Sequence, residues 1–281
     1  MKHLITAALL AVALWAGDYE DGFEAYKNKQ YEKAAQLFEK AAQQNNAGAQ
    51  LTLGVMHSNG EGVSRDYKKA AHWYQKAADQ NVTAAHFNLG LLYEKGKGVQ
   101  KDSKKAAYWY EKAAKENFVP AQVNLGALYE HAYGVPKDYK KAAYWYEKAA
   151  NLDYPMAQYN IGNFYHDALG LSKDYKKAAY WYGKAAKQGH AQAQTNLGMM
   201  YEKGEGVSQD LPKALHWYHI AAKQNNAQAY SNLGLLYAKG NGVQQNDQKA
   251  YEYWQKAAKQ GETTAQKNLD ILCRKNPSLC K

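Results

Sequence analysis

The stretch AAHFNLGLLYEKGKGVQKDSKKAAYWYEKAA, residues Ala84–Ala114, decides the fold of this 281-residue chain because its pattern recurs along most of the sequence. Its Leu-Gly glycine returns every 36 residues, as Leu-Gly or Ile-Gly, at Gly54, Gly90, Gly126, Gly162, Gly198 and Gly234. A tryptophan follows 19 residues after each of the first five glycines. Such a fixed period is typical of repeat proteins, in which each copy packs against its neighbours.

One copy of the pattern indicates two helices joined by a glycine-containing turn. In the first copy, Ala49, Leu53 and His57 are four residues apart and share one face of a helix. A Gly-x-Gly-Val stretch ends that helix, and Asp66 stands where an N-cap residue accepts backbone N–H groups of a second helix over residues 67–78. A lone hairpin cannot bury its apolar stripes, so we expect the copies to stack into a continuous core.

The last copy departs from the period. Its tryptophan, Trp254, comes one residue late. This delay predicts a one-residue insertion in the preceding loop, near Gln245 and Asn246, and Asp247 as the capping aspartate of that copy.

The first residues have the pattern of a secretory leader. Lys2 and His3 form a basic start, the uncharged run of residues 4–14 is too short to span a bilayer as a helix, and the small residue Ala16 precedes a strongly polar sequence. We therefore expect residues 1–16 to be a signal peptide cut near Ala16, and the protein to be periplasmic or secreted.

The two cysteines, Cys273 and Cys280, both lie within the last nine residues. In an oxidising compartment this spacing favours a small disulfide loop that holds the end of the last helix. A metal site and a pair of free thiols are the alternatives, but no histidine or further cysteine stands nearby to complete a tetrahedral set.

Composition narrows the class of protein. The chain carries 36 Lys and Arg against 26 Asp and Glu, a formal charge of +10, and its mean hydropathy of −0.73 excludes a multi-span membrane protein. Most of the excess lysines stand at both ends of the second helices, which predicts a solvated outer face, so we expect no nucleic-acid partner and at most weak attraction to the envelope surface. His216 and His219 have helical spacing without a carboxylate on that helix, so we expect neither metal nor cofactor.

The sequence from Ala84 to Ala114 resembles the consensus of the Sel1-like repeat family, a relative of the tetratricopeptide repeats. The resemblance covers six copies over residues 47–262, with an N-terminal helical half-repeat over 17–46 and a capping helix with its Cys273–Cys280 loop over 263–281. It implies an all-α, right-handed α/α superhelix whose first helices line the concave side. Members of the family serve mainly as adaptors for protein partners, so the resemblance implies a non-catalytic scaffold, which we expect to be a monomer.

Positions that vary between copies indicate where a partner would bind. Three residues before and one after each glycine, the first helices present apolar groups on a face that we expect to be open, and aromatic anchors on such a face are typical of interaction sites. The alternative is that adjacent first helices cover these side chains. The candidates are Leu51, Phe87, Leu91, Val123 and Tyr159.

A column of asparagines stands two residues before the glycine. Asparagine is a modest helix former, so its recurrence needs a reason. The amides could bind the backbone of an extended peptide, or each could bridge to the neighbouring copy. The candidate binding residues are Asn88, Asn124, Asn160, Asn196 and Asn232.

An enzymatic alternative comes from the cysteine-rich secreted branch of the family, which has been linked with penicillin binding and β-lactamase activity. That branch carries a cysteine pair in each repeat, whereas this chain has one pair at its end. Its only Ser-x-x-Lys sequence, Ser278–Lys281, lies at the C-terminus, and no Lys-Thr-Gly sequence accompanies it. We therefore propose no catalytic residue.

Overall fold

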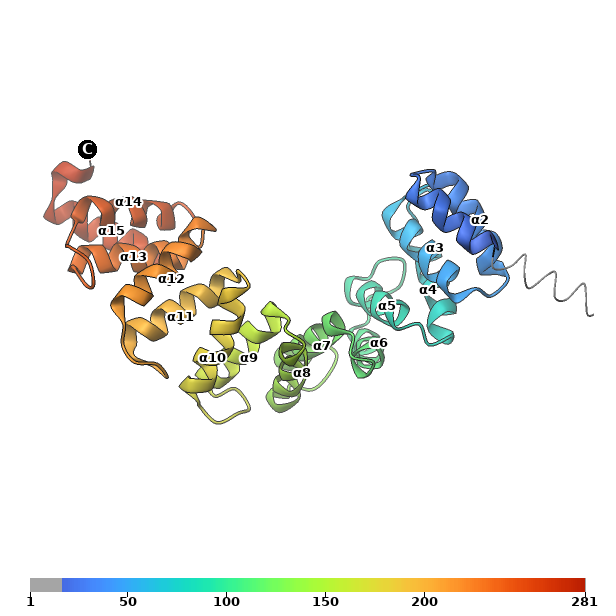
Figure 1. The fold of residues 1–281 in the computed structure, drawn as a ribbon, viewed down its shortest axis with the longest axis horizontal. Coiled ribbons are helices and arrows are strands. Elements are labelled where there is room, and N and C mark those ends of the chain that lie inside the picture. Colours follow the sequence, from blue (N-terminus) through green and yellow to red (C-terminus); the bar gives the residue numbers. More distant parts are fainter. Residues whose placement is uncertain (1–16, 281) are drawn as a thin grey trace, which may run out of the picture. The chain divides into compact units, whose positions relative to one another are not determined.

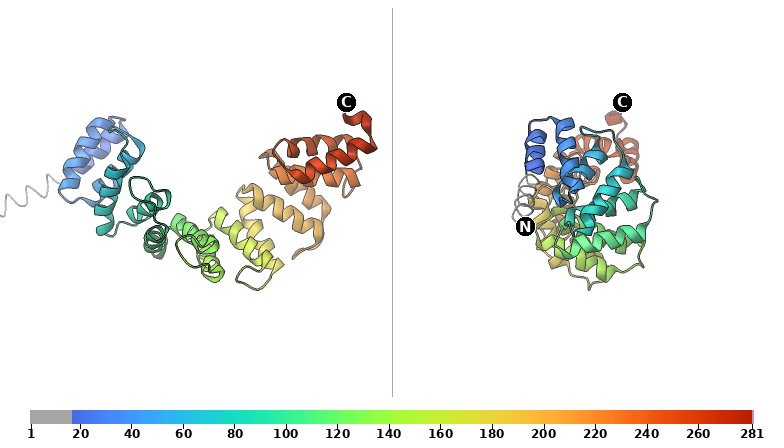
Figure 2. Two further views of the ribbon diagram at one scale, coloured as in Figure 1. Left: turned by 180° about the vertical axis from the view of Figure 1, so that it is seen from behind. Right: turned by 90° about the vertical axis from the view of Figure 1, so that its right-hand side faces the viewer.

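The computed structural model describes residues 17–280, and every regular element within them is helical. The chain divides into two compact units, Met1–Asp138 and Tyr139–Lys281. Figures 1 and 2 show that consecutive helices of each unit stack side by side in chain order. The expected leader, residues 1–16, lies outside the described residues, and so does Lys281.

Unit 1 begins with a helical segment over residues 17–27, which precedes α2 and so adds a helix pair ahead of the first 36-residue copy. The helices are α2 (Tyr31–Gln43), α3 (Ala47–Asn59), α4 (Tyr67–Asp79), α5 (Thr83–Lys95), α6 (Ser103–Lys115) and α7 (Val119–His131). The first helices α3 and α5 each pack against the second helix of their own copy and against the helix before them, and α7 packs against α6.

Unit 2 continues the same alternation and ends in a single helix followed by a short 3-10 turn. Nearly all of its helices have 13 residues, as in unit 1. They are α8 (Tyr139–Asn151), α9 (Pro155–Asp167), α10 (Tyr175–Lys187), α11 (Ala191–Lys203), α12 (Leu211–Lys223), α13 (Ala227–Lys239), α14 (Asp247–Ala258), α15 (Thr263–Lys275) and η1 (Pro277–Cys280).

Local sequence sets the ends of these helices. Asp66 caps α4, because its carboxylate accepts two backbone N–H groups of the first turn at 2.9 and 3.1 Å. Gly60 ends α3 in the left-handed conformation with φ +77°. Ala132 and Ala168 replace this glycine in two copies and still adopt φ +60°, which costs about 1 kcal/mol each.

The core is built from alanines and from the tyrosine that follows each tryptophan. The deepest rings are those of Tyr110, Tyr146, Tyr182 and Tyr218, which are fully buried. The tryptophans vary in depth, because Trp73, Trp145 and Trp181 are buried whereas Trp109 and Trp217 are only half-buried. The tyrosine column is thus the main aromatic layer of the core.

The last copy has no insertion, contrary to the sequence-based expectation. Asn246, not Asp247, caps α14 by accepting the N–H of Lys249 at 2.9 Å, and it stands 12 residues after Gly234, as Asp66 stands 12 after Gly54. Trp254 occupies the place of the core tyrosine against Gly234. The copy therefore keeps its length and exchanges the order of its two aromatic residues.

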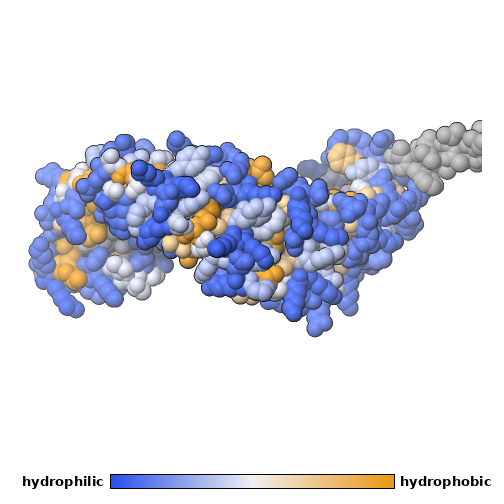
Figure 3. All heavy atoms as spheres, turned by 90° about the horizontal axis from the view of Figure 1, so that it is seen from below, coloured by the Kyte–Doolittle hydropathy of each residue, from blue (hydrophilic) through white to orange (hydrophobic). Residues whose placement is uncertain are grey.

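The C-terminal end is held as the cysteine spacing predicted. Cys273 and Cys280 form a disulfide, with their Cα atoms 5.7 Å apart, and this joins η1 to α15. The alternatives of a metal site or free thiols are thereby excluded in this structure. In the described part of the chain, no helix has the length and apolar character needed to cross a membrane. The face seen in Figure 3 is mostly hydrophilic with small scattered apolar patches.

Candidate functional site

The junction between the two helices of a copy depends on one glycine and one tyrosine. A Cβ atom on Gly90 would lie 2.5 Å from Cδ1 of Tyr110, and one on Gly162 would lie 2.7 Å from Cδ1 of Tyr182. Real Cβ atoms do not approach so closely. The recurring glycine therefore exists to let the tyrosine ring of the second helix reach the surface of the first.

The hydroxyl groups of these tyrosines point out of the core toward the first-helix face, where their acceptors differ. Tyr110 donates to the Glu94 carboxylate, whereas Tyr182 donates to Oδ1 of Asn163 at 2.6 Å. Burial first and then the Glu94 hydrogen bond raise the pKa of Tyr110 far above its ordinary range, so this phenol stays a donor. The same ring position thus supports different surface chemistry in different copies.

The asparagine column contributes to the contact between neighbouring copies. Asn196 donates to Oδ1 of Asn163 in the preceding copy at 3.4 Å, which favours the structural interpretation for this residue. Asn232 accepts the side-chain amide of Gln228 on its own helix at 3.1 Å, and Asn124 is half-buried. Asn88 and Asn160 are half-buried, and Asn88 lines a pocket described below.

The apolar column three residues before the glycine is less open than expected. Val123 is only 6% exposed and is part of the core, which corrects its assignment to an open face. Leu51, Phe87 and Tyr159 are half-buried. The reason is close packing between copies: first helices lie near enough for these side chains to seal the junctions.

The aromatic members of this column show how the sealing works. The Phe87 ring lies 5.0 Å from that of Phe118, at the start of the next first helix. Tyr159 stacks on His190 in the same way, with centroids 4.7 Å apart and planes 23° apart. Each ring therefore covers the N-terminus of the following helix and keeps only one side toward solvent.

Two pockets of similar size lie in the same register of the repeat, one in each unit. The pocket of unit 1 has a volume of about 330 Å³, and that of unit 2 about 320 Å³. Each lies beside a core tyrosine and is closed by the first helix of the next copy. We call these the junction pockets. Equivalent linings are Val55, Ser58, Tyr74, Asn88 and Leu91 in unit 1, and Asn163, His166, Tyr182, Asn196 and Met199 in unit 2.

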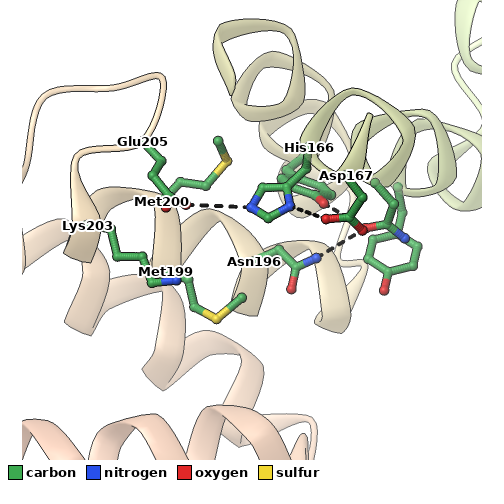
Figure 4. Close-up of a pocket in the computed structure, with 10 residues that line it drawn as sticks. His166, Asp167, Asn196, Met199, Met200, Lys203 and Glu205 are labelled. Atoms are coloured by element: carbon green, nitrogen blue, oxygen red, sulfur yellow. Dashed lines mark hydrogen bonds and ion pairs between the residues drawn. The ribbon is translucent and has the colours of Figure 1, made fainter. Parts of the chain in front are cut away.

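The junction pocket of unit 2 is polar on one wall (Figure 4). His166 lies between two carboxylates, with Nδ1 2.6 Å from Oδ1 of Asp167 and Nε2 3.5 Å from Oε2 of Glu205. Asn196 donates to Asn163 at 3.4 Å beneath them. Met199 supplies an apolar opposite wall.

The junction pocket of unit 1 has a simpler chemistry. Ser58 and the Tyr74 hydroxyl lie 3.3 Å apart at its base, and Val55 and Leu91 line its sides. Leu91, a predicted binding residue, is therefore placed in a pocket. Among residues 17–280, no three His, Cys, Asp or Glu side chains are grouped so that they could hold a metal ion.

Ser278, the serine of the only Ser-x-x-Lys sequence, is exposed. Its hydroxyl donates to Oδ1 of Asn276 at 2.7 Å. Lys281 lies outside the described residues, so the structure does not place the two side chains together.

A second polar column was not identified from the sequence. Gln50, Gln122, Gln158 and Gln194 are buried, and each donates its amide to an alanine carbonyl of the preceding helix at 3.0 to 3.3 Å. His86 takes the same place in the second copy. The sequence contains a pattern that could have identified this column, because a glutamine or histidine stands four residues before the repeat glycine in five of the six copies.

Comparison with known proteins identifies the repeat. The model of the Sel1 repeat matches seven successive segments: residues 7–46, 47–82, 83–118, 119–154, 155–190, 191–226 and 227–262. The first match, residues 7–46, is longer than the half-repeat over 17–46 that the sequence pattern predicts. Among curated proteins, none is significantly similar to this chain.

Two solved structures show the same fold at substantial sequence identity. A Sel1 repeat protein from Oxalobacter formigenes is 36% identical, with a TM-score of 0.74, over 85% of this chain and 96% of that one. A protective antigen of uropathogenic Escherichia coli strains, which displays an SLR fold, is 32% identical with a TM-score of 0.87. The match covers 93% of this chain and 57% of the antigen, so this chain spans little more than half of that protein's length.

The repeat matches, the all-helical architecture and the two related structures agree with one another. The 36-residue period and its glycine–tyrosine junction are thus the hallmarks of a known solenoid. This chain belongs to the Sel1 repeat family.

Proposed function

We propose that this protein is an exported, non-catalytic scaffold that binds an extended segment of a partner protein along the first-helix face of its repeats. Sel1 repeats typically bind proteins. The observation that carries the proposal is the pair of junction pockets, which lie at the same position of the repeat beside a core tyrosine but differ in their lining side chains. Because the packing is kept while the lining varies, each pocket can recognise a different side chain of a bound peptide.

The two pockets favour different side chains of the partner. The unit 1 pocket, between Val55 and Leu91, suits an apolar side chain. The unit 2 pocket offers carboxylates at Asp167 and Glu205 next to the apolar Met199, which suits a side chain with an apolar stem and a polar donor at its end.

Filling the pockets tests this assignment. Peptides selected from a random library on the protein should lose at least about tenfold in affinity when Leu91→Trp or Met199→Trp occupies its junction pocket, measured by titration calorimetry. Ile271→Trp, at an exposed position on α15, is the matched control and should leave affinity unchanged. Equal affinity for all three variants would refute binding at the junction pockets.

Export is a separate part of the proposal. The leader pattern over residues 1–16 and the disulfide between Cys273 and Cys280 support it, since disulfides persist in oxidising compartments. Mass spectrometry of the protein from the periplasmic fraction or culture medium should give an N-terminus near Gly17. A chain found only in the cytosolic fraction, and still beginning at Met1, would contradict it.

A further inference from the structure

A row of exposed aromatic rings runs along the second helices, on the side away from the core. The residue 18 positions after the repeat glycine is aromatic or histidine in five of the six copies: His72, Tyr108, Tyr144, Tyr180 and His216. In unit 2, Tyr144 on α8 and Tyr180 on α10 are 51% and 58% exposed. Neither the fold nor the proposed peptide site uses these rings.

Each of these tyrosines belongs to a compact group with its tryptophan and a lysine one turn later. Tyr144 meets Trp145 edge to face, with centroids 5.0 Å apart, and Nζ of Lys148 lies 5.2 and 5.5 Å from the two ring centroids. We call this group a Tyr–Trp–Lys triad. Tyr180, Trp181 and Lys184 repeat it on α10, with centroids 5.0 Å apart and Nζ within 6 Å of both rings.

Folding does not require a ring at this position. The tryptophans of the two triads are buried, but the tyrosines before them project outward. Glu252 occupies the equivalent place on α14 without altering that helix. Exposed aromatic rings that gather on one surface are typical of sites that meet a ligand.

The two triads of unit 2 lie on neighbouring second helices. Lys184 of α10 and Gln188, which directly follows α10, both reach Oδ1 of Asp153 just after α8, at 3.5 and 3.4 Å. The same groups therefore recur one copy apart on one surface. A folded protein partner presents a different side chain at each step, whereas a polymer presents the same unit repeatedly, so identical triads fit a repeating polymer.

Charge defines the polymer further. Lys140 and Lys176 are exposed at the starts of α8 and α10, and Lys148 and Lys184 stand within the triads. Two acidic residues lie near the triads: Glu147 accepts a hydrogen bond from Tyr165 and is replaced by Gly183 on α10, and Asp153 forms the ion pair with Lys184. The four lysines outnumber these two carboxylates, so the surface is net cationic and carries flat apolar rings, which complements an anion with flat apolar faces.

We propose that the two Tyr–Trp–Lys triads on α8 and α10 bind an anionic polysaccharide. The C–H face of a sugar ring stacks on each tyrosine, and the acidic group of that sugar pairs with the triad lysine. The choice of a polysaccharide over a nucleic acid rests on the proposed export, which the disulfide at Cys273–Cys280 supports. This inference goes beyond the proposed peptide site and uses a different surface.

The experiment compares one polymer with two that each lack half of its chemistry. Polygalacturonate carries both sugar rings and carboxylates, its fully methyl-esterified form keeps the rings without the charge, and polyglutamate keeps the charge without the rings. Binding of each to the full chain is measured by biolayer interferometry at about 0.15 M salt, where long-range attraction is screened within about 8 Å.

Polygalacturonate should bind at least about tenfold more tightly than either control polymer. The double variant Tyr144→Ser with Tyr180→Ser should lose about tenfold in that affinity, since both changed side chains are exposed and the fold does not depend on them. Tyr133→Ser removes an exposed tyrosine outside any triad and should change nothing.

Three outcomes would overturn the proposal. Equal binding of polyglutamate would show a purely electrostatic surface, and unchanged binding by the double variant would show that the triads on α8 and α10 are not the site. Tighter binding of single-stranded oligo-dT than of polygalacturonate would show that the rings are a stacking platform for nucleic acid bases.

Discussion

The junction pockets of the two units have the same frame and opposite chemistry. In both, a tyrosine ring packs on a glycine and sends its hydroxyl to the first-helix face. In unit 1 the hydroxyl of Tyr74 meets Ser58, while in unit 2 Tyr182 meets Asn163 beside the polar group of His166. The comparison shows that the tyrosine ring and the glycine provide the packing, so the hydrogen-bond acceptor of the hydroxyl can differ between copies.

The largest effect should come from filling the space between the repeat glycine and the core tyrosine ring, which both units need for packing. Gly90→Ala in unit 1 and Gly162→Ala in unit 2 each place a Cβ within 2.7 Å of a buried tyrosine ring, so each should destabilise its unit by about 1–3 kcal/mol. Urea unfolding followed by circular dichroism measures the loss. Gly183→Ala is the control, because a Cβ there meets nothing within 4 Å. If both variants lose no more stability than this control, the close packing of glycine on tyrosine is not what holds the two helices together.

A smaller effect should distinguish the charged hydrogen-bond acceptor of Tyr110 from the neutral acceptor of Tyr182. Tyr110→Phe removes a donor to the Glu94 carboxylate and should cost about 2 kcal/mol, whereas Tyr182→Phe removes a donor to the neutral amide of Asn163 and should cost about 1 kcal/mol. Urea titrations of both variants and of Glu94→Gln give the comparison. Equal losses for the two variants would show that the charge of the acceptor has no role.

The smallest effect concerns the histidine beside the unit 2 pocket. Burial lowers the pKa of His190, whose Nδ1 accepts the N–H of Ala193 at the start of α11. The lowered pKa keeps His190 neutral in the folded protein, whereas its pKa in the unfolded chain is ordinary. Its contribution to the free energy of unfolding is therefore present above about pH 6.5 and is lost as pH falls below that value. His190→Asn should therefore remove up to about 1 kcal/mol of pH dependence.

The matched residues for that test are already in the chain. Asn46 and Asn226 cap the equivalent helices α3 and α13. Asn226→His should introduce the acid sensitivity that His190→Asn removes, as measured by thermal unfolding between about pH 5 and 8. Identical slopes against pH in both variants and the parent would contradict the assignment.

Periodicity predicted the helices but not the depth of each side chain. The spacing of Gly90 and Trp109 fixed the two helices of a copy and their turn, because helix caps and glycine turns act locally. It did not show that Tyr110 lies deeper than Trp109, since depth depends on how closely two helices approach. That approach is set by the glycine, whose role becomes visible only in three dimensions.

The same limit explains the remaining differences. Trp254 looked like a delayed tryptophan because its neighbour Tyr253 shares its aromatic character, and only the packing on Gly234 assigns the register. Val123 looked exposed because one copy was considered without its successor. The candidate pockets are formed by three helices from two copies, so no single repeat contains their pattern.

The buried glutamine column bears on how such a chain can lengthen. Gln158 donates to a carbonyl of the copy before it and accepts a hydrogen bond from Gln188 of its own copy, and Gln194 and Gln224 repeat this arrangement. These copies, and the copy with Gln50 and Gln80, thus bring both the donor that the preceding copy needs and the acceptor that their own second helix needs. A copy of this kind inserted by gene duplication would find these bonds satisfied at once, so the array can grow or shrink by such units without first evolving new contacts.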